Sequence, residues 1–235
     1  MRFLLTLQYL GTRYAGWQMQ ANGVSVQQVV EEALAKMFRE PVRVHGAGRT
    51  DAGVHAAGQR AHIDAPFAIP ARGLVLGLNQ ILPHDVRIVR VEEVADDFHA
   101  RFSAKTKTYE YRIWNAEVAD VFAAETHAHV AQTLDVARMH EAAQQLVGTH
   151  DYKAFTVADP EVSSTTRTID AIRVERDSAQ ITITVSADGF LRYMVRRIAG
   201  SLIEIGRGKL SAGALMTEAR WTAPAKGLVL REIRY

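Results

Sequence analysis

Residues 25–38, SVQQVVEEALAKMF, carry the clearest helix signal in the chain. Ser25 followed by Gln28 has the pattern of a capping box, which satisfies backbone N–H groups at the start of a helix. Apolar side chains recur on one helical face at Val26, Val29, Val30, Ala33, Leu34 and Met37. The preceding segment FLLTLQY, residues 3–9, alternates in the two-residue rhythm of a strand, with Phe3, Leu5, Leu7 and Tyr9 on one side. A strand followed by an amphipathic helix is the opening of a βαβ unit.

The remaining chain continues this alternation and then repeats it. The first half has predicted strands at residues 42–45, 58–64 and 85–94, with a helix at about 70–82. The second half has the same order, with a strand at 107–114, a helix at 134–148, a hairpin at 167–188, a helix at 190–206 and a strand at 228–235. The sequence therefore predicts an α+β protein of two tandem ferredoxin-like (split βαβ) halves, residues 1–105 and 106–235, with a central cleft between them.

Composition restricts the class of protein. The chain has 235 residues, of which 48% are hydrophobic and 23% charged, as in ordinary globular proteins. It has no cysteine, which excludes disulfides, thiolate zinc sites and cysteine nucleophiles. A formal net charge of +2 with basic clusters such as KTK at 105–107 permits a polyanionic partner. Because no apolar run is long enough for a signal peptide or a membrane span, we expect a soluble, cytoplasmic protein.

A second segment, GAGRTDAGVHA at residues 46–56, has the composition of a functional loop. Its glycines let the backbone bend sharply and lie close to a ligand. A dinucleotide-binding loop is excluded, because Asp51 stands where that fingerprint needs a third glycine and a carboxylate there would repel phosphate. The residues alone leave two interpretations open. The loop either presents an ionised Asp51 as nucleophile or base with Arg49 as its cation, or is a surface turn with a weak ion pair.

The same loop resembles the active-site loop of the tRNA pseudouridine synthase A (TruA) family. Further segments resemble that family in the family's order, namely YAGWQ (14–18), LNQILPHDV (78–86), DDFHARFSAKTKTYEYRI (96–113), GFLRYMVRRIAGSL (189–202) and KGLVLREI (226–233). The resemblance implies a pseudouridine synthase fold and a homodimer that works without metal or other cofactor. It also implies conversion of uridine to pseudouridine in the anticodon arm of tRNA, at positions 38, 39 and/or 40.

The resemblance also assigns roles to single residues. It makes Asp51 the essential carboxylate and Arg196 its ionic partner. Tyr109 matches the tyrosine that stacks on the target base and is a candidate for removing the C5 proton. Removal of the proton would need electrostatic help, because an ordinary phenol has a pKa of about 10, whereas stacking needs none. Arg49 is expected to replace the flipped nucleotide in its stack. Lys105 and Lys107 are expected to contact phosphate.

Several alternatives stay open at this stage. Tyr111, on the same strand face as Tyr109, suits a place in the core, and Trp17 suits either the core or an RNA contact. His45, His55 and His62 surround the loop, yet without a carboxylate or thiolate at ligand spacing a metal site is not expected. His55 is expected to brace the loop. Leu10 and Met19 depart from the family pattern near the presumed RNA entrance.

Two other functions compete with the isomerase. A non-catalytic RNA-binding protein could be built from tandem ferredoxin-like sheets, but the aromatic signature of RNA-recognition motifs is missing from the sequence. A carboxylate-based hydrolase acting on a small molecule would need turnover of a free base or nucleoside. We therefore expect an RNA-isomerising enzyme.

Overall fold

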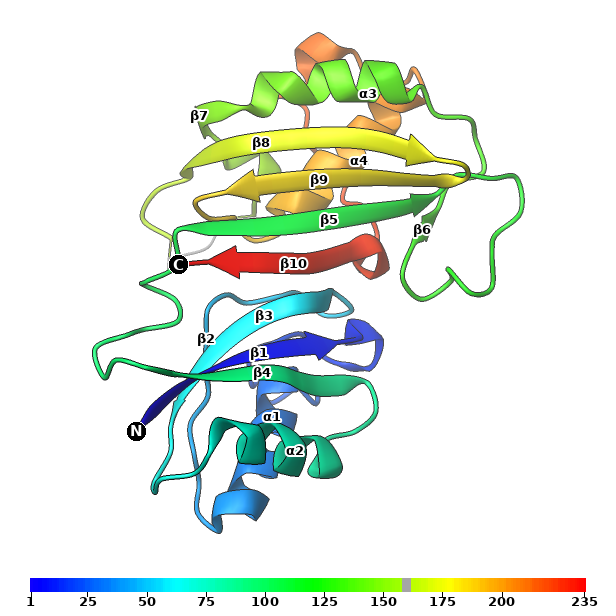
Figure 1. The fold of residues 1–235 in the computed structure, drawn as a ribbon. Helices are drawn as coiled ribbons and strands as arrows, with labels where there is room; N and C mark the ends of the chain where they lie inside the picture. Colours follow the sequence, from blue (N-terminus) through cyan, green and yellow to red (C-terminus); the bar gives the residue numbers. More distant parts are fainter. Residues whose placement is uncertain (158–161) are drawn as a thin grey trace. The chain divides into compact units, whose positions relative to one another are not determined.

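The computed structural model describes residues 1–157 and 162–235, which form two compact units (Figure 1). Unit 1 contains Met1–Lys105 and Leu230–Tyr235, and unit 2 contains Thr106–Val229. The sequence pattern places the last six residues in the second half of the chain. In the structure they belong to unit 1 instead. The Lys105 N–H donates to the Arg234 carbonyl at 2.8 Å, and the Tyr235 hydroxyl donates to the Ala100 carbonyl at 3.1 Å. These bonds tie the end of the chain to unit 1.

Unit 1 alternates strands and helices in the predicted order. Its elements are β1 (Arg2–Tyr9), α1 (Val26–Phe38), β2 (His45–Gly46), β3 (His55–Asp64), α2 (Ala71–Ile81) and β4 (Val86–Val94). The strands β4, β1 and β3 lie side by side and antiparallel, and the short β2 pairs with β3. This is the strand order of a ferredoxin-like unit, in which β1 lies between the last strand and the third.

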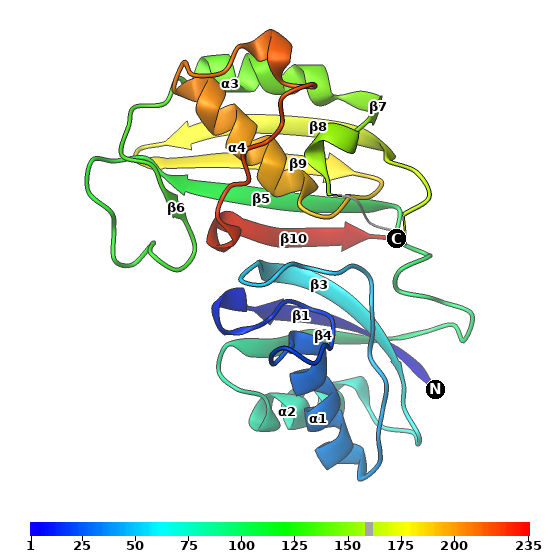
Figure 2. The ribbon, with the colours of Figure 1, turned by 180° about the vertical axis from the view of Figure 1, so that it is seen from behind.

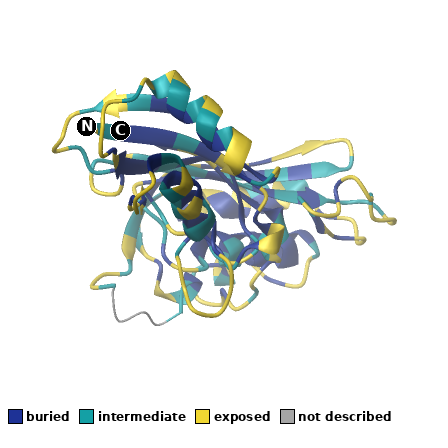
Figure 3. Ribbon diagram, turned by 90° about the horizontal axis from the view of Figure 1, so that it is seen from below, coloured by how far each residue is buried: buried dark blue, intermediate teal, exposed yellow. Residues whose placement is uncertain are grey.

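The core of unit 1 follows the periodicity of the sequence. The side chains of Phe3, Leu5, Leu7 and Tyr9 on β1 are all buried, as predicted, and Leu4 is buried as well. On α1 the buried apolar residues are Val26, Val30, Ala33, Leu34 and Phe38, whereas Val29 and Met37 are half-buried. Ser25 accepts the Gln28 backbone N–H as a cap, but the Gln28 side chain donates to Glu32 instead of completing the capping box. Figure 3 shows the buried residues along the strands and inner helix faces.

Unit 2 has more strands than unit 1, and several of them follow one another directly along the chain. Its elements are β5 (Thr106–Trp114), β6 (Ala128–His129), α3 (Val136–Ala143), β7 (Gly148–Asp151), β8 (Thr166–Asp177), β9 (Gln180–Ala187) and α4 (Met194–Gly206), and it ends in β10 (Leu228–Arg234), which continues into unit 1. The sheet of unit 2 has the order β5, β9, β8, β7, with β6 parallel to β5. Seen from behind, α4 crosses the face of this sheet (Figure 2).

Several predicted boundaries were wrong, and one of them is the start of β3, which lies at His55 and not at residue 58. Residues 42–44 are not a strand, because β2 begins only at His45. The helix predicted over 134–148 ends at Ala143 in a 3₁₀ turn, Gln144–Leu146, and Gly148 starts β7 with φ of 103°. The helix predicted from residue 190 begins at Met194, because Tyr193 has a left-handed backbone with φ of 64°. Across the described ranges, no helix combines the length and apolar character that crossing a membrane requires.

Candidate active site

Asp51 lies in the loop between β2 and β3, and buried side chains hold the backbone of this loop. Gln59 donates from Nε2 to the Gly48 carbonyl at 2.9 Å, and the Tyr9 hydroxyl and Thr50 Oγ1 are 2.8 Å apart. Tyr9, Gln59 and Thr50 are all buried, whereas Asp51 is half-buried. Buried polar groups are costly to leave unpaired, so these bonds resist movement of the loop. Such anchoring favours a loop that presents Asp51 over a simple surface turn.

Tyr9 acts in this network as a protonated phenol. Burial raises the pKa of Tyr9 to about 12, and its hydrogen bonds with Thr50 and Gln59 act against this rise. The hydroxyl therefore keeps its proton at neutral pH and can donate while it also accepts a bond. Neither Tyr9 nor Gln59 stands out in the sequence as a functional residue, because the Tyr9 ring fits an ordinary apolar strand position.

The YAGWQ segment supports the loop from a second side. The backbone N–H of Trp17 donates to the Thr50 carbonyl at 3.1 Å, and the backbone N–H of Gly53 donates to the Tyr14 carbonyl at 3.3 Å. The Trp17 indole packs so close to Gly46 that a Cβ built there would lie 2.3 Å from Nε1. Because Trp17 is only 2% exposed, it belongs to the core, and its alternative role as an RNA contact is excluded.

The LNQILPHDV segment in turn holds the YAGWQ segment. Asp85 is buried and accepts the Tyr14 hydroxyl at 2.8 Å and the Arg13 guanidinium at 2.6 Å. Burial, together with the Asp85 carboxylate, raises the pKa of Tyr14. The charge-assisted bonds place Asp85 in a structural role. Two motifs that are distant in sequence thus form one support for the loop of Asp51.

His55 also anchors the loop. Its Nδ1 accepts the Gly11 N–H at 2.9 Å, and the side chain is buried. This agrees with the expected bracing role. Arg49 is exposed, and Leu10 and Met19 are exposed too.

The predicted site residues of unit 2 lie on β5 and α4. Tyr109 is 7% exposed, and its ring meets Phe190 edge-on at 5.1 Å. Tyr111 is fully buried and donates from its hydroxyl to the Pro224 carbonyl at 2.9 Å, so it is the core tyrosine of the pair. Burial raises the pKa of Tyr111, while the positive charge of Arg196 acts against that rise.

Arg196 lies in the first turn of α4 and is held by the segment before β10. Its Nε donates to the Ala223 carbonyl at 2.9 Å, and the Ala223 N–H donates back to the Arg196 carbonyl at 3.0 Å. Arg192, which the helix predicted over 190–206 would include, precedes α4. Asp51, Arg49 and Lys105 thus belong to unit 1, and Tyr109, Lys107 and Arg196 belong to unit 2.

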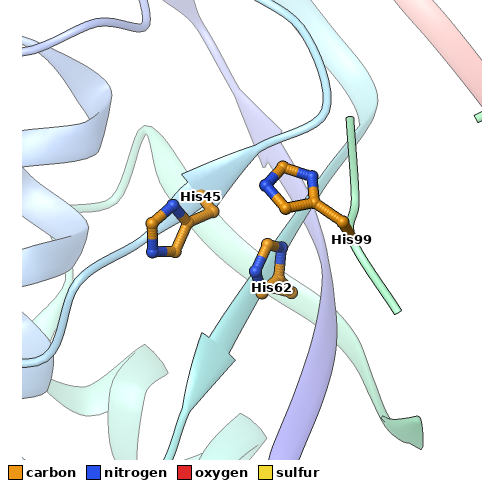
Figure 4. Close-up of side chains that lie close together, drawn as sticks. All are labelled: His45, His62 and His99. Carbon is orange, nitrogen blue, oxygen red and sulfur yellow. The ribbon is translucent and has the colours of Figure 1, made fainter. Parts of the chain in front are cut away.

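Three histidines of unit 1 form a cluster that the sequence does not reveal, because they come from β2, β3 and the turn after β4. His45, His62 and His99 each offer a ring nitrogen, and these nitrogens lie within 4.8 Å of one another. Figure 4 shows the three side chains close together. The rings of His45 and His62 are stacked, with centroids 4.8 Å apart, and His99 meets His62 edge-on at 4.6 Å.

The hydrogen bonds of this cluster suit neutral imidazoles better than metal ligands. Nδ1 of His62 accepts the Ala100 N–H at 3.1 Å, and Nδ1 of His99 accepts the Arg101 N–H at 3.1 Å. In the neutral rings the proton therefore sits on Nε2. A metal-bound histidine instead donates its second ring N–H to an acceptor. If a metal bound Nε2 of either ring, Nδ1 of that ring would carry the proton. The Nδ1–H would then point at the backbone N–H that now donates to it, so two donors would meet.

We expect unit 1 to lose stability in acid because of this cluster. Burial, followed by the charges of His45, His99 and Arg2, lowers the pKa of His62 from 6.5 to about 4. A histidine whose folded pKa is depressed stabilises the fold above its unfolded pKa, and this contribution is lost as the pH falls toward the folded pKa. The free energy of unfolding should therefore fall between pH 6.5 and about 4, by up to about 3 kcal/mol.

Urea unfolding measured across this pH range tests the expectation. His62→Asn keeps an acceptor for the Ala100 N–H but cannot be protonated, so its stability should depend less on pH. The exposed His84 provides the control, since His84→Asn should leave the pH dependence of the wild type unchanged. An equally steep loss of stability in His62→Asn would contradict the assignment.

Comparison with known proteins identifies the family. A family model described as tRNA pseudouridine synthase matches residues 6–103 and 142–235. Proteins named tRNA pseudouridine synthase A are similar over nearly the whole chain. The protein from Myxococcus xanthus is 43% identical, with 100% of this chain and 92% of the relative covered. The one from Geobacter sulfurreducens is 41% identical, and the one from Ruminiclostridium cellulolyticum is 44% identical, each with 98% of both chains covered. From these matches, the chain belongs to the tRNA pseudouridine synthase family.

Proposed function

We propose that this enzyme converts uridine to pseudouridine in the anticodon stem-loop of tRNA, at positions 38, 39 and/or 40, with Asp51 as the catalytic carboxylate. The observation that carries the proposal is the loop of residues 46–56, whose aspartate is presented on a backbone held by Tyr9, Thr50 and Gln59. A catalytic group must be held in a narrow range of geometries, and rigid support of this kind provides it. The relatives, named tRNA pseudouridine synthase A, support tRNA as the substrate.

The reaction makes three chemical demands. The bond between C1′ of the ribose and N1 of uracil must break, the freed base must turn, and C5 must join C1′ and lose its proton. Asp51 is the group for the first step, by attack on C6 of the ring, by attack on C1′ or by removal of a proton from the sugar. Tyr109 retains the base by stacking, since an aromatic face binds any base without a change of charge.

The remaining residues act on charge and on the RNA. Arg196 is the ionic partner of the Asp51 carboxylate. Arg49 takes the place of the uridine after that nucleotide has left its stack. Lys105 and Lys107 contact phosphates, and such contacts offset the few kcal/mol that unstacking costs. No step in this scheme calls for a cofactor.

Tritium release from tRNA tests the activity. Unmodified tRNA labelled at C5 of uridine loses one tritium for each pseudouridine formed, because C5 exchanges its hydrogen for the new bond. We expect the purified protein to release label from full-length tRNA and from an isolated anticodon arm. Substrates in which the uridines at positions 38 to 40 are replaced by cytidine should release none. Release of tritium from those substrates would show that the enzyme modifies uridines at other positions.

We also propose that the enzyme is a homodimer in the cytoplasm, where its substrate is found. The loop between β5 and β6 supports an interface, because it exposes Val118, Val121 and Phe122, the last by 95%. Several large apolar side chains exposed in one loop favour an interaction site. The lack of cysteine suits a reducing compartment.

Light scattering tests the dimer. The wild type should have twice the mass of one chain, and the double variant Val121→Ser, Phe122→Ser should have the mass of a single chain. Phe102→Ser is the matched control, since Phe102 is 77% exposed but lies in unit 1, outside this loop. A monomeric wild type, or a double variant that stays dimeric, would contradict this interface.

A further inference from the structure

Tyr193 has an unusual backbone conformation at the start of α4. Its φ is 64° and its ψ −2°, in the left-handed region, and its side chain makes no capping hydrogen bond. Among the described residues, the other non-glycine positions with positive φ are Arg39 and Ser178. Arg39 ends α1, and Ser178 lies in the turn between β8 and β9, where this conformation is common. The Met194 N–H donates to the Leu191 carbonyl at 3.1 Å, so Tyr193 is the third residue of a tight turn that leads into α4. Glycine or asparagine is the usual residue at this position, because it needs positive φ, and a bulky aromatic residue there carries strain of the kind found at functional sites.

The ring of Tyr193 lies against two guanidinium groups. The Cζ of Arg192 is 5.1 Å from the ring centroid, and the Cζ of Arg196 is 5.2 Å from it. Arg192 also approaches the Tyr193 hydroxyl, at 3.4 Å. A planar guanidinium over an aromatic face is held both by charge and by stacking. The strained backbone therefore places an aromatic surface next to Arg196.

Arg196 is held from its other end by the backbone of Ala223. The bond from Nε to the Ala223 carbonyl fixes the inner part of the guanidinium, and the Ala223 N–H fixes the main chain of Arg196. A long side chain anchored at Nε can still turn about its remaining torsions. The Tyr193 ring restricts that motion, because stacking favours guanidinium orientations parallel to the ring.

We propose that Tyr193 is a positioning residue that fixes the orientation of the Arg196 guanidinium. The inference rests on the role proposed above for Arg196. Tyr193 takes no part in bond making. Its aromatic face restricts the Arg196 guanidinium, so the hydroxyl group is not needed for this role. The energy stored in its backbone is offset by the two cation–aromatic contacts and by the fixed geometry of Arg196.

Three substitutions at position 193 separate positioning from simple stability. Tyr193→Phe keeps the ring and should retain wild-type kcat. Tyr193→Ala and Tyr193→Gly both remove the ring, and both should lower kcat about tenfold, with little change in the KM for tRNA. Only glycine adopts positive φ without strain, so Tyr193→Gly should melt about 2–4 °C above Tyr193→Ala. The loss of kcat should thus be the same in two variants of different stability.

Ser178 provides the matched control for the backbone effect. Ser178→Gly should likewise melt above Ser178→Ala, because Ser178 has φ of 55°, but both variants should keep full activity. The proposal is overturned if kcat follows the melting temperature across the position 193 variants, if Tyr193→Phe is as impaired as Tyr193→Ala, or if the ring-free variants keep full kcat.

Arg196→Ala separates this proposal from the one on which it rests. A large loss of activity in Arg196→Ala, with full activity in Tyr193→Ala, would refute the role of Tyr193 alone. Full activity in Arg196→Ala would refute the role of Arg196 and, with it, that of Tyr193.

Discussion

Asp51→Asn should abolish pseudouridine formation, with a fall in rate of at least about 10³-fold. Asparagine has nearly the same shape as aspartate but can neither act as a nucleophile at carbon nor take up a proton. The buried groups that hold the loop bind the Gly48 carbonyl and the Thr50 hydroxyl, and the substitution alters neither of them. The variant should therefore fold, unfold at the same urea concentration as the wild type and still bind tRNA.

Single-turnover release of tritium from C5-labelled tRNA measures this effect. The matched control is Asp97→Asn, because Asp97 is an exposed carboxylate of unit 1 outside the loop. Asp97→Asn should react at the rate of the wild type. A rate for Asp51→Asn within tenfold of the wild type would show that another group supplies the chemistry.

Gly16→Ala should cause a large loss of stability through the support of the loop. Gly16 has φ of 95°, and a Cβ built there would lie 2.5 Å from the Thr50 carbonyl oxygen, an atom of the main chain. Strain at positive φ and the clash add together, so we expect the free energy of unfolding to fall by about 3 kcal/mol. Because the clash pushes on the residue next to Asp51, the rate of isomerisation should fall as well, by about 10²-fold for a shift near 1 Å.

Urea unfolding of Gly16→Ala and of a second glycine variant measures this effect. Gly73 lies in α2, and a Cβ built there would meet the Ile69 side chain at an ordinary 3.6 Å. Gly73→Ala should therefore be as stable as the wild type, or more stable by up to about 1 kcal/mol, because alanine favours a helix over glycine. If Gly16→Ala matched Gly73→Ala in stability, the close packing of the YAGWQ segment on the loop would be refuted.

Local pattern was sufficient for most elements of the fold. The apolar spacing of SVQQVVEEALAKMF and the alternation of FLLTLQY led to α1 and β1 because each periodicity matches one buried face. The same reasoning failed at the start of α4. The apolar stripe continues back to Leu191, but the Met194 N–H donates to the Leu191 carbonyl in a tight turn that gives Tyr193 positive φ, and no local preference predicts a left-handed tyrosine.

For the candidate site, the sequence indicated which residue carries the chemistry. It did not indicate which side chains hold the loop of that residue in place. The residues of the 46–56 loop identified the family, and Asp51 is the carboxylate in it, because a motif of neighbouring residues is written directly in the chain. Tyr9 lies 41 residues from Thr50, and Gln59 lies 11 residues from Gly48, the groups of the loop that they bind. The histidine cluster is likewise assembled from three segments. Such contacts arise only when strands pair and side chains far apart in sequence are buried together, so they could be recognised only in the folded chain.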